Sequence, residues 1–411
     1  MPLELPAPYR CGVVSSSVLR QITIEGFKAI RSATMHLEPF TLFIGRNGVG
    51  KSSVLEALQW LRNAAKLGLG DATKERYGSF SDLLNRRSSN VYLDLRFDGG
   101  ARNSAHYELR ARSGTKNSAY RPIVDFERCV VGRTMAARTV IWSRSDTRRG
   151  APFRWIRNRT ERALVIKSGD QLALGASTSR VPGASDLAEF LDNSVFLRLS
   201  PTAMAVEVNA RRRSGRALLS EDGSDLPLLI ERLPAASKRA LVRRVAALFP
   251  SVQKISVNTS GDAKHLVVSE RMISRGGTKT FPIPAWLLSE GMRRIVAIFA
   301  LLEARPRPPL IAIEEIENGL DPWTLEHVLD ELRLAADDGT QIIVTTHSPF
   351  LLDHVETDEV IHVRREAGES TYERVADLPT VATYKDVMAP GAMYLMKLFG
   401  GEEESTDASE D

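Results

Sequence analysis

The stretch that most restricts the fold of this 411-residue chain is residues 41–53, TLFIGRNGVGKSS. Its first four residues form an apolar run, which predicts a buried strand. After the glycines, apolar residues recur at helical spacing, at Val54, Leu58 and Leu61. A strand that passes through a glycine-rich turn directly into a helix is typical of a phosphate-binding loop, and a chance glycine loop between the two elements is the alternative.

Gly45, Gly50, Lys51 and Ser52 stand at the spacing G-x-x-x-x-G-K-[ST]. Glycines permit the tight turn that points several N–H groups at a polyphosphate, and the helix beginning near Lys51 directs its positive end to the same place. We expect Lys51 to reach the β- and γ-phosphates and Ser52 to bind magnesium. The loop therefore predicts a nucleoside triphosphate site. Its residues are Gly45, Arg46, Asn47, Gly48, Val49, Gly50, Lys51, Ser52 and Ser53.

Composition favours a cytoplasmic protein with a sizeable core. Hydrophobic residues make up 43% of the chain and charged residues 26%, an ordinary balance for a globular protein of two or three domains. No apolar run approaches the roughly 18 residues that a membrane helix needs, and the N-terminus lacks the pattern of a secretory signal. Cys11 and Cys129 show no pairing pattern, which suits a reducing compartment.

Strand patterns flank the loop on both sides. Residues 19–27 alternate as a strand, as do residues 92–97 and 107–110. With Asp98-Gly99-Gly100 as a turn, the last two predict an antiparallel meander packed beside the nucleotide-binding sheet. Residues 68–70 are expected to form a loop that ends the helix after Lys51.

The middle of the chain predicts a compact α+β region. Residues 186–191 and 225–248 have helical patterns, the second interrupted at Pro234, and residues 252–258 and 265–269 predict a hairpin. No heptad pattern occurs, which excludes a long coiled-coil arm.

Arginines are concentrated in two parts of this region. Trp142, Phe153 and Trp155 are interleaved with the first group, and arginines with aromatic residues suit a phosphate backbone or an unstacked base. A solvated arginine-rich surface is the alternative, and it is the more common meaning of a run of charges. The two groups are Arg133, Arg138, Arg144, Arg148, Arg149, Arg154, Arg157, Arg159 and Arg162, and then Arg211, Arg212, Arg213 and Arg216.

The last third alternates strands and helices. Residues 310–313 form a continuous apolar run, a helix follows Pro322, and residues 342–344 form the next strand, which predicts a parallel sheet. Acids follow the first strand at Glu314 and Glu315. Ligands of open α/β sheets lie at the carboxyl ends of strands, so we expect Glu314 to hold magnesium and Glu315 to orient the attacking water. His347 follows the next strand, where it could reach a γ-phosphate, although a lone histidine there is commonly structural.

In this order, these motifs resemble the ABC-type ATPase heads of the SMC, Rad50 and RecF group, and most closely the compact bacterial AAA-21 or OLD-like ATPases. Gly45–Ser52 matches Walker A, residues 288–291 (LSEG) the signature, Ile311–Glu315 Walker B, residues 318–322 (NGLDP) the D-loop and His347 the switch histidine. Residues 218–226 (LLSEDGSDL) are similar to a segment that these compact ATPases carry before the signature.

Two features depart from the family pattern. Aspartate is usual where Glu314 stands; the extra methylene group of glutamate still lets the carboxylate reach magnesium, but the family's inner-shell geometry does not carry over unchanged. The Q-loop glutamine has no counterpart at residues 78–82 (GSFSD), so sensing of the metal and γ-phosphate could be done differently.

The resemblance implies an ATP- and Mg²⁺-dependent ATPase that dimerises around ATP. Ser289 and Gly291 would cap the γ-phosphate held by a second copy, with Asp321 in the adjoining D-loop. The chain is also expected to divide into five parts. These are an extension (1–17), an N-terminal lobe of the head (18–125), a basic middle region (126–280), a C-terminal lobe (281–398) and an acidic tail (399–411).

The process driven by the ATPase is left with alternatives. Because no Toprim-like domain or His/Cys metal cluster is recognised, any nuclease or toxin activity is expected in a separately encoded effector. The first interpretation is an ATPase that acts with DNA or RNA in repair or antiphage defence. The second is a nucleotide-gated scaffold without nucleic-acid binding, and a transporter ATPase is disfavoured by the long basic middle region. The acidic tail is either a solvated end or a mimic of nucleic acid.

Overall fold

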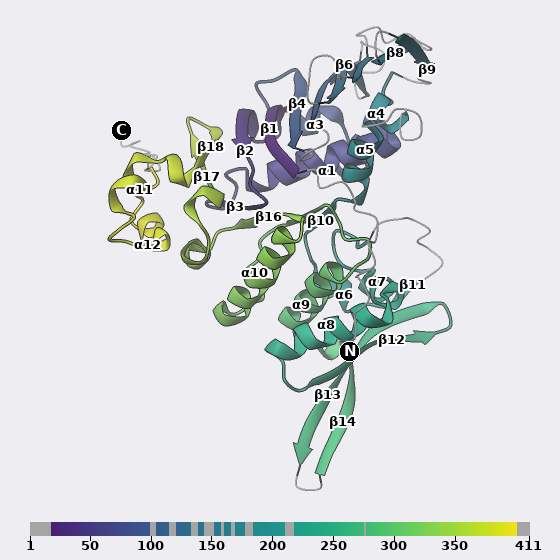
Figure 1. Ribbon diagram of the computed structural model, residues 1–411, viewed down its shortest axis with the longest axis vertical. Helices are drawn as coiled ribbons and strands as arrows, with labels where there is room; N and C mark the ends of the chain where they lie inside the picture. The colour runs from purple at the N-terminus through teal and green to yellow at the C-terminus, as the bar shows by residue number, and fades with distance from the viewer. Residues whose placement is uncertain are drawn as a thin grey trace, which may run out of the picture.

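The computed structural model describes residues 18–98, 104–114, 121–132, 139–143, 152–157, 160–165, 169–176, 184–209, 218–274 and 277–400. They form three sheets with helices between and around them (Figure 1). The extension 1–17, both arginine-rich groups and the acidic residues from 401 onward lie outside the described backbone or side chains. No helix of the described part is long and apolar enough to cross a membrane.

A six-stranded sheet forms the centre of the fold. Strand order is β10-β15-β16-β3-β17-β18, with parallel neighbours from β10 to β17 and an antiparallel β18. The predicted parallel sheet is thus confirmed, and the N-terminal β3 lies between two strands of the last third. The bounds are β3 Phe40–Ile44, β10 Val195–Leu197, β15 Leu310–Ile313, β16 Gln341–Thr346, β17 Val360–Glu366 and β18 Glu369–Arg374.

Both faces of this sheet are buried, because side chains alternate between two cores. Leu42 and Ile44 pack into a core with α8 (Ala235–Leu248), α9 (Glu290–Leu302) and α10 (Pro322–Asp337). Phe43 points to the opposite core, where α1 (Lys51–Leu67) packs between the central sheet and the antiparallel sheet. The α1 helix therefore connects the phosphate loop to both sheets.

The predicted meander is an eight-stranded antiparallel sheet of order β2-β1-β4-β5-β6-β7-β8-β9. The expected boundary between residues 125 and 126 falls inside β6, and the sheet continues across it. The bounds are β1 Val18–Phe27, β2 Ile30–His36, β4 Asn90–Asp98, β5 Ala105–Ser113, β6 Pro122–Val131, β7 Thr139–Ser143, β8 Pro152–Arg157 and β9 Thr160–Val165.

The prediction of a loop over residues 68–70 is wrong in its length. Gly68 alone ends α1, and α2 (Leu69–Tyr77) begins at the next residue, before the short α3 (Phe80–Leu83). Gly68 has φ +88°, a conformation that only glycine adopts readily. One residue therefore turns the chain without a longer loop.

The middle region confirms the helices and the hairpin predicted from sequence. A break at Pro234 separates α7 (Leu226–Arg232) from α8, and β12 (Val252–Ser260) pairs with β13 (Ala263–Ser274). The sequence did not predict β14 (Gly277–Pro284), which contains two prolines and little apolar alternation. The smaller elements are α4 Ala173–Ala176, α5 Ala184–Asn193, α6 Pro201–Met204 and β11 Val208–Asn209.

Strands β13 and β14 project from the body as a two-stranded ribbon (Figure 1). The chain then passes through a short 3₁₀ turn (Ala285–Leu287) into α9. Beyond the central sheet, the C-terminal part adds α11 (Pro379–Tyr384) and α12 (Pro390–Leu395). The ribbon is therefore continuous in sequence with the helix that carries the predicted signature.

One acidic side chain is buried under the antiparallel sheet. The Glu127 carboxylate accepts hydrogen bonds from the backbone N–H groups of Ala173 (2.7 Å) and Leu174 (2.9 Å) and from the Tyr107 hydroxyl (3.0 Å). Its burial raises the pKa of this carboxyl group to about 7, despite the opposing effect of these donors. The side chain thus joins α4 to the sheet through a group that titrates near neutral pH.

This burial predicts a pH dependence of stability. Between the unfolded pKa near 4.5 and the folded value near 7, the folded chain holds a proton that the unfolded chain has released. The free energy of unfolding should therefore fall as pH rises through this range and then level off. Glu127→Gln cannot titrate, so its urea midpoint should change less than that of the wild type between pH 5 and pH 8. Equal changes in the two proteins would contradict the assignment.

Candidate active site

The predicted phosphate loop joins the end of β3 to the start of α1, as its sequence indicates. Gly48 and Gly50 have φ values of +78° and +114°, which favour glycine. Gly45 is required for a different reason, because a Cβ atom there would lie 2.1 Å from the backbone oxygen of Val363 on β17. The loop is thus shaped both by its own torsion angles and by the neighbouring strand.

Two side chains of β18 hold the loop from behind. The Ser370 hydroxyl donates to the carbonyl oxygen of Val49 (2.5 Å), and the Tyr372 hydroxyl donates to that of Gly50 (2.9 Å). Sequence reasoning missed both residues, because a serine and a tyrosine in a short polar strand carry no recognisable signal. Both side chains thereby tie the carbonyl oxygens of the loop to β18.

The Lys51 side chain folds over the loop that precedes it. Its ammonium group donates to the carbonyl oxygens of Gly45 (2.6 Å) and Arg46 (2.9 Å). Burial lowers the pKa of Lys51, and the charges of Glu317 and Glu315 oppose that shift. The ammonium therefore lies at the mouth of the loop and near the acids after β15, where it suits a phosphate.

Ser52 and Glu314 meet as the sequence predicted. The Ser52 hydroxyl donates to Oε2 of Glu314 across 3.3 Å, although 262 positions separate the two residues. Glu314 is only 8% exposed, and its burial raises the pKa of the carboxyl group, while the charge of Arg198 lowers it. A hydroxyl and a carboxylate at this spacing are hard oxygen donors, which fit Mg²⁺ held partly through water and phosphate oxygens.

Glu315 is fixed in an uncommon conformation. Its φ of +48° is in the left-handed region, its backbone N–H donates to the Thr345 hydroxyl (3.0 Å), and the Asn318 amide donates to its carboxylate (2.6 Å). Such conformations concentrate at functional sites, because the surrounding structure must impose them. The carboxylate predicted to orient water is thereby held in place by the next strand and by the D-loop.

His347 has a partner that the sequence reasoning missed. Its Nδ1 lies 2.9 Å from Oε1 of Glu317, which also accepts a hydrogen bond from the His347 backbone N–H (2.7 Å). The other Glu317 oxygen, Oε2, is buried without a hydrogen-bond partner among the described residues. A third acid after β15, Glu317, thus orients the imidazole of His347.

The predicted signature and D-loop lie against each other. Ser289 caps α9 by accepting the Met292 N–H (3.2 Å), and Asp321 caps α10 by accepting the Thr324 N–H (3.1 Å). The Thr324 hydroxyl also donates to the Asp321 carboxylate (2.6 Å), and these two hydrogen bonds from Thr324 lower the pKa of Asp321. A Cβ on Gly291 would lie 2.6 Å from the Gly319 oxygen, so glycine allows this close approach. Both helix starts are exposed at the surface.

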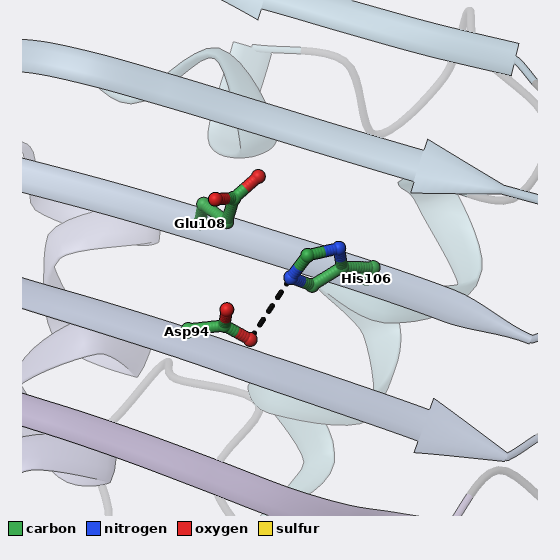
Figure 2. A group of neighbouring side chains, drawn as sticks. All are labelled: Asp94, His106 and Glu108. Carbon is green, nitrogen blue, oxygen red and sulfur yellow. Dashed lines mark hydrogen bonds and ion pairs between the residues drawn. The ribbon is translucent and has the colours of Figure 1, made fainter.

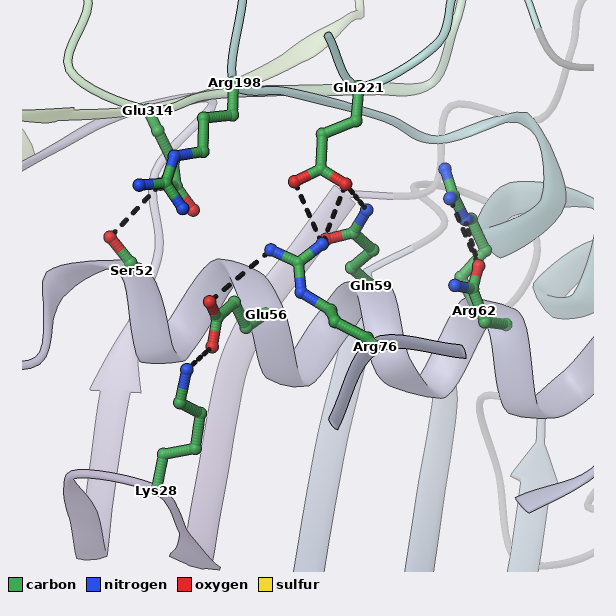
Figure 3. Close-up of polar contacts among 10 residues, drawn as sticks. Lys28, Ser52, Glu56, Gln59, Arg62, Arg76, Arg198, Glu221 and Glu314 are labelled. Atoms are coloured by element: carbon green, nitrogen blue, oxygen red, sulfur yellow. Dashed lines mark hydrogen bonds and ion pairs between the residues drawn. The ribbon is translucent and has the colours of Figure 1, made fainter. Parts of the chain in front are cut away.

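A polar network extends from the nucleotide site along α1 (Figure 3). Glu56 pairs with Lys28 and with Arg76, and Glu221 accepts from Arg76 (2.7 Å) and Gln59 (2.8 Å). Glu221 belongs to the segment 218–226 that resembles the family. This segment therefore contacts α1 through side chains, behind the Ser52 and Glu314 pair.

One further group of potential metal ligands lies on the antiparallel sheet. Asp94, His106 and Glu108 approach one another on neighbouring strands, with His106 Nε2 2.9 Å from Asp94 Oδ1 (Figure 2). Arg96 lies 3.6 Å from Asp94, and Arg128 donates to Glu108 (3.2 Å). Because arginines already balance both carboxylates, the cluster is better described as a cross-strand ion-pair ladder than as a metal centre.

The phosphate loop follows β3, and the acids follow β15 of the same parallel sheet. This arrangement defines a P-loop nucleotide-binding domain of mixed α/β class. A family model described as "AAA domain, putative AbiEii toxin, Type IV TA system" (AAA_21) matches residues 40–353. The chain belongs to this AAA_21 family. The resemblance to compact AAA-21 ATPases is therefore confirmed, whereas the narrower OLD-like description stays a prediction.

Solved SMC head domains are similar to the chain at low identity. The head of Thermotoga maritima SMC is 15% identical, with a TM-score of 0.40, covering 87% of this chain and 98% of that one. A Pyrococcus furiosus Smc head with an extended coiled coil, bound to the C-terminal domain of ScpA, is 14% identical, with a TM-score of 0.49 and coverages of 87% and 96%. An SmcHead bound to the C-winged helix domain of ScpA is 15% identical, with a TM-score of 0.46 and coverages of 86% and 97%. No curated protein sequence matches the chain.

Proposed function

We propose that the protein binds ATP with Mg²⁺, hydrolyses it and dimerises around it. The observation that carries this proposal is the convergence of Lys51, Ser52, Glu314 and Glu315, from two distant parts of the sequence, at one edge of the central sheet. Four groups of these types are what triphosphate hydrolysis needs. They are a cation for the phosphates, two oxygen ligands for the metal and a carboxylate for the water.

Each residue has a distinct role in this proposal. Lys51 and the loop N–H groups bind and orient the phosphates, while Ser52 and Glu314 hold the metal, which neutralises charge that develops in the transition state. Glu315 orients the attacking water and accepts its proton. His347, oriented by Glu317, contacts the terminal phosphate. The Asn318 amide keeps Glu315 in position, which couples the D-loop to the hydrolysis step.

The dimer would form through the exposed starts of α9 and α10. Ser289, Gly291 and Asp321 are positioned there, and Trp323, close to Asp321 in sequence, is 81% exposed. Large exposed aromatic groups are characteristic of interfaces. A second molecule could bury Trp323 and bring Ser289 to the γ-phosphate that it holds, with the helix N-terminus favouring the anion.

The test is the mass of the wild-type protein in solution with Mg²⁺ and different nucleotides. A non-hydrolysable ATP analogue is expected to convert the monomer to a dimer in multi-angle light scattering, and ADP is expected to leave it monomeric. Equilibrium binding of labelled nucleotide is measured alongside. Absence of binding would overturn the nucleotide site, whereas binding without an increase in mass would overturn only the dimer.

The wider role that we propose is control of a nucleic-acid-linked process, repair or antiphage defence, in the cytoplasm. The arginine-rich parts of the sequence favour DNA or RNA as a partner. The projecting β13–β14 ribbon favours a protein partner, a separately encoded effector such as a nuclease or toxin. On the ribbon, Met272, Ile273 and Phe281 are exposed, Ile273 at 76%. Turnover stimulated by DNA or RNA and weakened steeply by salt would favour this role. Salt-insensitive turnover without nucleic-acid binding would favour the nucleotide-gated scaffold.

A further inference from the structure

Arg198 lies beside the proposed metal ligand because of strand order. It directly follows β10, which pairs in parallel with β15, and the Glu314 N–H donates to the carbonyl oxygen of Leu197 (2.8 Å). The residues that follow the two strands are therefore neighbours. Arg198 Nε lies 3.7 Å from Oε2 of Glu314 (Figure 3).

The same carboxylate oxygen has two competing neighbours. Oε2 of Glu314 accepts from Ser52 and faces the Arg198 guanidinium, so the position that suits a divalent cation is already next to a positive charge. Glu56 adds a second negative charge nearby, and the Glu314 side chain is largely buried. A metal ion entering alone would meet repulsion from Arg198 at short range.

The Arg198 backbone is held while its side chain extends into solvent. Its N–H donates to the Glu221 carbonyl oxygen (2.8 Å), and the Glu221 carboxylate is fixed by Arg76 and Gln59. The side chain itself is 66% exposed. A long arginine on a fixed backbone can exchange one anionic partner for another without a change in the fold.

We propose that Arg198 is a triphosphate-binding residue, which neutralises the Glu314 carboxylate before nucleotide binds and contacts the phosphates once Glu314 holds the metal. This rests on the proposed MgATP site. The guanidinium disfavours a metal ion without nucleotide, and the phosphates of ATP give it a new partner as the metal takes Glu314. Metal and triphosphate therefore enter together, and the arginine adds affinity for the triphosphate.

The test measures Mn²⁺ binding, by electron paramagnetic resonance, to the full chain without nucleotide. Arg198→Ala is expected to bind Mn²⁺ at least tenfold more tightly than the wild type, and Arg198→Lys, which keeps the charge, is expected to stay near the wild type. With Mn²⁺ present, Arg198→Ala is expected to lose about tenfold in affinity for the ATP analogue and less for ADP. Arg307→Ala, which removes a cation paired with Asp338 on the surface, is the matched control.

Glu314→Gln in the Arg198→Ala background should remove the added Mn²⁺ affinity, which places the ion at this carboxylate. Unchanged nucleotide-free Mn²⁺ affinity in Arg198→Ala, or the same gain in Arg307→Ala, would overturn the proposal. These results are distinguishable from failure of the proposed function, because that failure appears in the wild type as absence of Mn²⁺-dependent nucleotide binding. Circular dichroism and the thermal midpoint check that each variant is folded.

Discussion

Replacing Glu315 by glutamine is expected to slow ATP hydrolysis by about 100- to 10,000-fold while nucleotide binding is retained. Glutamine keeps the shape of the side chain and can still meet the Asn318 amide, but it cannot accept a proton from the attacking water. Because binding and hydrolysis are separated, the ATP-bound state should accumulate. Light scattering with Mg²⁺ and ATP itself should then show a persistent dimer.

Lys51→Ala is the contrasting variant. It removes the ammonium group that the loop carbonyls hold at the phosphate site, so weak ATP binding and a monomer are expected. The proposed function requires Glu315→Gln to be dimeric and Lys51→Ala to be monomeric in the presence of ATP. If Glu315→Gln and Lys51→Ala had the same mass with ATP, hydrolysis would not be the event that separates the molecules.

Gly45→Ala is expected to destabilise the protein by roughly 3 kcal/mol, with loss of nucleotide binding. The added Cβ would lie 2.1 Å from the backbone oxygen of Val363, which is carried by a buried strand of the central sheet and cannot turn away as a side chain would. Either β17 or the phosphate loop must shift. Denaturant unfolding and binding of labelled nucleotide measure the two effects.

Gly48→Ala is the matched control in the same loop. A Cβ at this position has no atom within 4 Å, so only the positive φ opposes it, at a cost of about 1 kcal/mol. The difference between the two variants isolates the close contact with β17. Equal destabilisation would show that backbone torsion, rather than the approach of Val363, is what makes glycine necessary at position 45.

The local sequence was sufficient to predict those elements whose structure depends mainly on the residues of a single segment. The spacing from Gly45 to Ser52 predicted a strand, turn and helix, and the apolar run before Glu314 predicted a buried strand that ends at acids. The extent of the loop at Gly68 and the existence of β14 were missed. The loop is short because Gly68, with a positive φ, turns the chain within one residue. Strand β14 has little apolar alternation and is stabilised by its pairing with β13.

Residues that assist the site could not be found in this way. Ser370, Tyr372, Glu317 and Arg198 have ordinary sequence surroundings, and no spacing rule singles them out. Ser370 reaches the phosphate loop across 321 positions of sequence, and Arg198 reaches Glu314 because β10 pairs with β15. Contacts of this kind depend on strand order, which many sequences with the same local patterns could arrange differently.

The sequence by itself therefore determined the chemistry, which is a phosphate loop and two strand-terminal acids, since short-range backbone geometry and hydrophobic periodicity dictate both. Only the tertiary structure decided which groups support that chemistry. It placed β3 between β16 and β17, Tyr372 behind Gly50 and Arg198 beside Glu314. The reason is physical: strand order depends on how distant segments pack together on the two faces of the central sheet, and it decides which distant side chains meet.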